Sequence, residues 1–276
     1  MNARTSLSHD HSRSLRPTYL TSGRTPTTRR TSTRNSLRHR RRQHLEGTSA
    51  TQQTPQPAVW LEPSEQNRLL RQRSLNEARK GNFTDAIEGL DLLLERNPLS
   101  AVDYNNRGLV YFQCGQFASA LADYNHAIKL NPRLASAYNN RANYYAAQGC
   151  LAEALADYEA AIDLDPTNIR AWINQGITFR ELEAYSQAIE NFDHALQITQ
   201  LLSNGPTNTA ILEAHIYGAR GRTHHLAGDW NYAIADYNRA LEQFSCSKCI
   251  DSFASHRLLA QIDDWLDKLS APQAGF

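Results

Sequence analysis

A period of 34 residues constrains this chain more than any other feature of its sequence. When residues 101–134 are laid over residues 135–168 without a gap, 17 of the 34 positions are identical. The shared blocks are Tyr-Asn-Asn-Arg near the start, Ala-Asp-Tyr in the middle and a proline near the end. A repeat of this length indicates one small structural unit that stacks on copies of itself, because a single unit cannot bury its own apolar face.

Each unit is predicted to form two short helices. In the first complete unit, Tyr104, Gly108 and Tyr111 recur at the spacing of one helical face, and Gly115 marks the break after it. A second apolar stripe follows and ends before Pro132, which cannot continue a helix. The expected fold class is therefore all-α, with helical hairpins stacked along the chain.

The period also defines the domain organisation. It predicts five units within residues 64–247, at 67–100, 101–134, 135–168, 169–202 and 214–247, with an insertion at 203–213. Residues 252–269 follow the last unit and have an amphipathic pattern, with an apolar face made of Leu258, Ile262, Trp265, Leu266 and Leu269. We expect this segment to be a helix that caps the open end of the stack and turns a polar face to water.

Residues 1–57 differ from the rest of the chain in composition. They contain eleven arginines, no lysine and two acidic residues, which gives a charge of +9 and leaves −8 for the remainder of a chain whose total is +1. With so few large apolar residues, this tail cannot offset the entropy of ordering, and we predict that it is disordered. The run at Arg38, Arg40, Arg41 and Arg42 suits weak contact with nucleic acid or anionic lipid. We interpret the segment first as a solvated, weakly adhesive tail; a specific anionic partner and a transit peptide for an organelle are the alternatives.

Several classes of protein are excluded by what the sequence lacks. It has no apolar run near the ~20 residues of a membrane-spanning helix and no secretory leader in its first residues. Four cysteines are too few for a disulfide scaffold, which favours a reducing compartment. Cys246 and Cys249 have the spacing of half a zinc site or of a redox pair; we interpret them as ordinary thiols and leave both roles open. Because phosphate-loop, nucleophile-elbow and zinc-protease motifs are absent, we expect no enzyme, no cofactor and no metal.

The 34-residue pattern resembles the tetratricopeptide repeat family over about residues 67–247. The fourth unit departs from it, with Glu183 where glycine is usual and Gln200 where proline would fall. The resemblance implies a right-handed α-solenoid whose first helices line a concave groove, and a scaffold that binds a protein or peptide segment in that groove. The close-set Asn-Asn-Arg and Ala-Asp-Tyr blocks are similar to bacterial, including cyanobacterial, members, which favours the cytoplasm over an organelle.

Two charged registers repeat with the units. The arginines are Arg107, Arg141 and Arg220, and the aspartates are Asp123, Asp157 and Asp236. In the fourth unit both change together, to Gln175 and Asn191. We interpret this joint change as the sign of a structural ion pair between the two helices of a unit, worth about 0–1 kcal/mol where it is partly exposed.

Asparagines at one register of the first helices supply the candidate binding residues. Asn106, Asn140 and Asn174 are spaced by 34 residues, and resemblance to asparagine-ladder superhelices implies that such amides contact a peptide backbone. Duplication without function is the alternative. The predicted groove comprises Asn105, Asn106, Leu109, Gln113, Asn139, Asn140, Asn143, Arg170, Asn174, Ile177 and Arg180. The clamp by which some members of the family grip a C-terminal carboxylate is matched only at Asn140 and Arg170, so we do not expect it.

The alternative function is a tether to nucleic acid or to an anionic membrane through the basic tail.

Overall fold

The computed structural model describes residues 62–202, 209–246 and 253–270, and within these ranges the chain forms eleven α-helices and no strand. The helices are α1 (Pro63–Lys80), α2 (Phe83–Arg96), α3 (Ala101–Gln113), α4 (Phe117–Leu130), α5 (Ala135–Ala147), α6 (Leu151–Leu164), α7 (Ile169–Glu181), α8 (Tyr185–Leu202), α9 (Ala210–Ala227), α10 (Trp230–Cys246) and α11 (Phe253–Ser270). The predicted all-α solenoid is confirmed. The arginine-rich tail, residues 1–57, and Cys249 lie outside the described residues, so the predictions made for them stay predictions.

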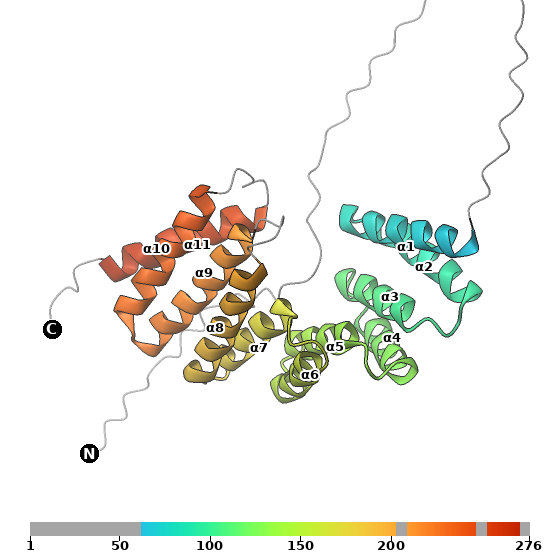
Figure 1. The fold of residues 1–276 in the computed structure, drawn as a ribbon, viewed down its shortest axis with the longest axis horizontal. Helices are drawn as coiled ribbons and strands as arrows, with labels where there is room; N and C mark the ends of the chain where they lie inside the picture. Colours follow the sequence, from blue (N-terminus) through green and yellow to red (C-terminus); the bar gives the residue numbers. More distant parts are fainter. Residues whose placement is uncertain (1–61, 203–208, 247–252, 271–276) are drawn as a thin grey trace, which may run out of the picture.

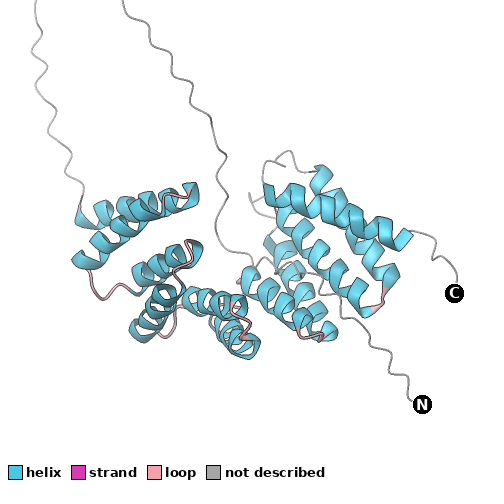
Figure 2. Ribbon diagram, turned by 180° about the vertical axis from the view of Figure 1, so that it is seen from behind, coloured by secondary structure: helices cyan, strands magenta, loops and turns pink. Residues whose placement is uncertain are grey.

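The helix pairs follow one another around an arc, with α1 and α2 at one end and α9, α10 and α11 at the other (Figure 1). The second helix of each unit packs on the first helix of the next unit, and the first helices α1, α3, α5, α7 and α9 also contact one another in that order. We call the surface formed by these first helices the inner face and the surface formed by the second helices the outer face. Both views place α3 and α5 on the inner side of the arc (Figures 1 and 2).

The two helices of a unit approach closely because a small residue on the first faces an aromatic ring on the second. A Cβ atom added at Gly108 would lie 2.8 Å from the ring of Tyr124, which is fully buried. A larger side chain at Gly108 would therefore force the ring out of its site. The same contact recurs between Gly176 and Phe192 and between Gly221 and Tyr237.

The fourth and fifth units depart from the regular pattern where their sequences do. Helix α8 continues to Leu202, past Gln200, because no proline interrupts it at that position. Glu183 adopts a φ of 60° at the turn where Gly115 and Gly149 adopt 81° and 79°. Helix α9 begins at Ala210, so residues 210–213 of the predicted insertion belong to the helix.

Helix α11 closes the C-terminal end of the stack by packing on α9 and α10. Its Leu258, Ile262 and Trp265 join the apolar cluster around Tyr237, and the rings of Trp265 and Tyr237 stack with centroids 5.4 Å apart. At Gly218 of α9 an added Cβ would lie 3.3 Å from Leu258, so glycine lets α11 lie close to α9. The capping helix thus buries the apolar face that the fifth unit would otherwise expose.

Candidate binding surface on the inner face

Arginine–aspartate pairs tie the two helices of a unit together, as the sequence predicted. Arg107 donates from Nε and Nη2 to the two carboxylate oxygens of Asp123, each at 2.8 Å. Its third nitrogen reaches Asp91 of the preceding unit at 2.6 Å, a contact that the sequence did not reveal. The guanidinium also lies 5.3 Å from the ring centroid of Tyr104 and 5.7 Å from that of Tyr111. The hydrogen bonds to Asp123 raise the pKa of Arg107, so this arginine stays charged and joins three helices.

The same arrangement recurs in two other units and is missing in the fourth. Arg141 bonds Asp157 in its own unit and Asn125 in the preceding one, while Arg220 bonds Asp236 and Asp193 in the same way. In the fourth unit Asn191 instead donates to the backbone oxygen of Gln187, 2.8 Å away in its own helix. The predicted structural pair is therefore confirmed in three units, and the fourth unit lacks it.

The predicted row of exposed asparagines is wrong at Asn174. Its side chain is fully buried and donates to Asn143 Oδ1 at 2.9 Å, an oxygen that also accepts from Tyr158 at 2.7 Å. The register places Asn174 on the same face of its helix as Asn106 and Asn140, which are only half-buried. The outcome differs because Asn143, a buried amide of the neighbouring unit, lies within reach of Asn174 and takes up its hydrogen bond.

The remaining asparagines form a chain of amides between the second and third units. Asn140 donates to Asn105 at 3.0 Å, Asn105 donates to Ser136 at 3.4 Å, and Asn139 donates to Asn140 at 3.5 Å. Asn105 and Asn139 are both buried, so the prediction that they line an open groove is corrected. Asn105 bonds the second repeat to the third, whereas Asn139 bonds only Asn140 of its own helix. The Oδ1 atom of Asn139 is the exception, a buried acceptor without a hydrogen bond.

The other predicted groove residues divide in the same way. Ile177 is buried in the apolar cluster of the fourth unit, and Arg180 donates to the backbone oxygen of Ala219 at 3.2 Å, so neither is a free surface group. Burial in the packed repeat also corrects the prediction for Asn143. Arg170 is exposed, whereas Leu109 and Gln113 are half-buried and lie together with Asn106.

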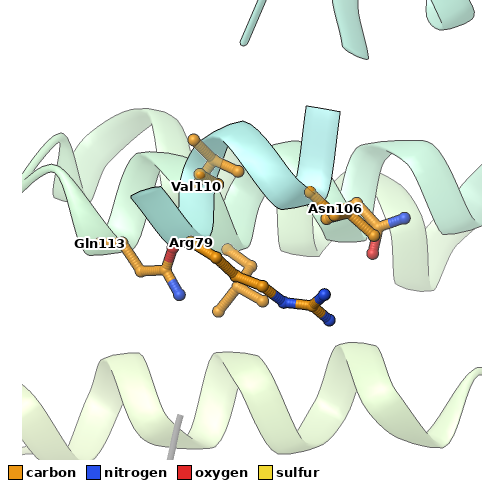
Figure 3. Close-up of a pocket in the computed structure, with 7 residues that line it drawn as sticks. Arg79, Asn106, Val110 and Gln113 are labelled. Carbon is orange, nitrogen blue, oxygen red and sulfur yellow. The ribbon is translucent and has the colours of Figure 1, made fainter. Parts of the chain in front are cut away.

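These last three residues line a hollow at the N-terminal end of the inner face, between α1 and α3. The N-terminal hollow, as we call it, has a volume of about 80 Å³ and is lined by Leu75, Ala78, Arg79, Asn106, Leu109, Val110 and Gln113. In the close-up, the side chain of Arg79 lies between those of Gln113 and Asn106 (Figure 3). The depression continues along α1, where Arg68, Arg71 and Gln72 join Leu75 and Arg79.

Sequence reasoning missed the contribution of α1 because the first unit is a degenerate copy. The signal was nonetheless available, since Gln72, Leu75 and Arg79 precede Asn106, Leu109 and Gln113 by one period of 34 residues. The same registers of two adjacent units therefore meet at the hollow.

The chemistry of the hollow is that of a recognition surface. Leucines form its floor, and the amides of Gln72, Asn106 and Gln113 make no hydrogen bond to any other described residue. Arg71 is held by two hydrogen bonds to Asp103, at 2.5 and 2.8 Å, which raise the pKa of Arg71. Nowhere in residues 62–202, 209–246 and 253–270 do three His, Cys, Asp or Glu side chains gather in a way that suits a metal ion.

A curved stack of helical pairs with an open inner face defines a helical-repeat solenoid, and comparison with known proteins identifies its family. The family described as TPR repeat matches residues 108–149, and the family described as tetratricopeptide repeat matches residues 135–168. Residues 108–168 of this chain thus match tetratricopeptide repeats, and repeats of this kind form protein-interaction scaffolds.

Solved structures agree in fold. PilF of Pseudomonas aeruginosa has a TM-score of 0.57 at 19% identity, covering 75% of this chain and 93% of its own. A thermophilic TPR protein of Thermus thermophilus has a TM-score of 0.56 at 18% identity, covering 72% and 98%. MamA of Desulfovibrio magneticus has a TM-score of 0.54 at 17% identity, covering 67% and 98%.

Among curated proteins, no relative matches this sequence. Within the part of the chain that the structure describes, no helix combines the length and the apolar character needed to span a bilayer.

Proposed function

We propose that this chain is a non-enzymatic scaffold that binds an extended segment of a partner protein along α1, α3 and α5 of the inner face. In this proposal the N-terminal hollow receives an apolar side chain of that segment. This proposal depends on one observation: in the hollow, the apolar side chains of Leu75 and Leu109 lie beside two amides, Asn106 and Gln113, that are free to bond a ligand.

The free amides suit the backbone of an extended peptide. Each side-chain amide offers two donors and one acceptor, which match the N–H and C=O groups of a chain without reading its side chains.

Rigidity of the repeats supports the proposal in a second way. The amide chain from Ser136 to Asn139 and the ion pairs of Arg107 and Arg141 hold α3 and α5 in one relative position. A surface that is already arranged loses less conformational entropy on binding, so more of the contact energy is available for affinity.

The test removes the free amides and leaves the core untouched. A random dodecapeptide library displayed on phage is selected on the full chain, and the tightest peptide is titrated by calorimetry. The double variant Asn106→Ala/Gln113→Ala should weaken that binding by about 1–3 kcal/mol, at a net value of about 1 kcal/mol per hydrogen bond. Its melting temperature should stay level, since both side chains are only half-buried.

The matched control is Gln197→Ala/Asn238→Ala, which removes two exposed amides from the second helices α8 and α10. This control should bind the peptide as the parent chain does. Equal affinity for the peptide in both double variants, with both folded, would reject the hollow as the binding surface.

A further inference from the structure

The charges of the repeats are divided between the two sets of helices. The first helices α1, α3, α5, α7 and α9 contain eleven basic and five acidic residues, whereas the second helices α2, α4, α6, α8 and α10 contain three basic and thirteen acidic residues. With histidine neutral, the first helices carry +6 and the second helices −10. Without the three pairs Arg107–Asp123, Arg141–Asp157 and Arg220–Asp236, which join the two sets, the charges are +3 and −7. The near-zero charge of the whole chain, +1, conceals this separation.

The positive charge of the inner face is concentrated beside the N-terminal hollow. Helix α1 alone holds five basic residues against two acidic ones. Arg79 bonds only the amide of Asn76, at 2.9 Å, and therefore has no carboxylate partner among the described residues. Arg68 pairs with Glu65, but both side chains are exposed, and such pairs contribute little. Both arginines consequently remain available to a ligand carboxylate.

A further positive charge lies on α7, the first helix of the fourth unit. Arg170 on α7 is exposed and makes no ion pair within the described ranges. Asp103 accepts two hydrogen bonds from Arg71, which balance its charge. A ligand lying over α1 and α3 therefore meets Leu75 and Leu109 beside the cations Arg68 and Arg79.

We infer that the partner of the inner face is an acidic segment that carries an apolar anchor residue. The anchor enters the N-terminal hollow against Leu75 and Leu109, and aspartates or glutamates on either side of it meet Arg68 and Arg79. This inference rests on the proposed function and adds the chemistry of the ligand. Opposite charges across an interface speed association and exclude partners of the wrong sign.

Charge distinguishes two ligands of the inner face that could come from this protein itself: its own tail and a second copy. The arginine-rich residues 1–57 carry +9 and are repelled by a positive surface, so they do not supply the ligand in cis. The outer face of a second copy has the matching sign, and self-association is therefore an outcome that the experiment must separate.

The experiment reads the composition of the peptides selected from the random dodecapeptide library on the full chain. We expect enrichment of aspartate and glutamate around one leucine, isoleucine or phenylalanine. Affinity of the best peptide should fall at least about ten-fold in Arg79→Glu, and severalfold as NaCl rises from about 0.05 M to about 0.5 M. Lys129→Glu is the matched control: it makes the same change of charge on the second helix α4 and should leave affinity within about two-fold. Arg79→Gln serves as the test variant if Arg79→Glu proves unfolded by circular dichroism.

Five results overturn the inference, and they are distinguishable. Neutral or basic selected peptides reject the acidic partner and leave the proposed function standing, whereas no enrichment above an unrelated protein rejects both. Acidic peptides that bind Arg79→Glu and the parent chain equally place the site elsewhere. Concentration-dependent self-association in sedimentation that Arg79→Glu abolishes makes a second copy the occupant. Tighter, Arg79-dependent binding of a twenty-residue oligothymidylate than of the acidic peptide makes nucleic acid the ligand.

Discussion

The third and fourth units share one backbone fold but are held together by different forces. The third unit has a small buried cluster of alanines around Tyr158, and the bonds of Arg141 to Asp157 and Asn125 tie its helices together. The fourth unit has no such arginine. Its cluster is larger and contains Ile173, Ile177, Phe192 and Leu196, together with Ile216 of the next unit.

The difference shows that polar ties and apolar burial substitute for each other within one repeat geometry. At one register Asn139 stands where the fourth unit has Ile173, and at another Arg141 stands where it has Gln175. A buried ion pair stabilises only when every partner is present, whereas each fully buried isoleucine contributes about 1.5–3 kcal/mol by itself. The fourth unit therefore tolerates the joint loss of arginine and aspartate because its core compensates.

The largest expected effect compares the two units at the same register. Ile173→Ala should lower the free energy of unfolding by about 3–4 kcal/mol, because the side chain is buried and its removal leaves a cavity. Asn139→Ala should change it by less than about 1 kcal/mol, since one amide oxygen has no partner and the only bond of its nitrogen is long. Urea denaturation of both variants measures the difference. Equal losses would mean that the third unit depends on apolar packing as much as the fourth does.

A smaller effect tests whether the ion pair behaves as a unit. Arg141→Ala should cost about 2–3 kcal/mol, because it leaves the buried carboxylate of Asp157 unpaired. The double variant Arg141→Gln/Asp157→Asn copies the residues of the fourth unit and should recover most of that loss. Thermal and urea unfolding give the free energies. A double variant as unstable as the single one would show that the guanidinium is needed for its contacts with Asn125 and the tyrosine rings as well.

The smallest effect concerns the turn between the two helices of each unit. Glu183→Gly should raise the free energy of unfolding by about 1 kcal/mol, because Glu183 is held at a φ of 60° where glycine is not strained. Gly149→Ala makes the reverse change in the third unit and should lower the free energy of unfolding by a similar amount. No atom lies within 4 Å of an added Cβ there, so the loss reports backbone strain and not a steric clash. The melting temperatures of the Glu183→Gly and Gly149→Ala variants test this prediction. A higher melting temperature for Gly149→Ala would show that a non-glycine residue causes no backbone strain at this turn.

The local sequence pattern was sufficient to predict the helices, their pairing within each unit and the arginine–aspartate ion pairs. The spacing of Tyr104, Gly108 and Tyr111 defines a helical face, and the joint change of Gln175 and Asn191 identified partners that lie 16 residues apart in the sequence. These features depend on contacts within one unit. Because the same pattern recurs in several units, each unit supports the interpretation of the others. The candidate site was predicted less well, because Leu109, Gln113 and Asn106 line the hollow while Asn174 and Ile177 are buried.

The sequence by itself determined that this chain is a stack of helical hairpins with a capping helix, because periodicity follows from the geometry of single helices. Only the tertiary structure decided which residues of a register remain open to a ligand. Asn106 and Asn174 have the same place in their helices, but Asn143 of the neighbouring unit accepts a hydrogen bond from Asn174, and no described residue does so for Asn106. Likewise, the two faces of opposite charge exist only because stacking gathers all first helices on one side, which a count of charges along the chain does not reveal.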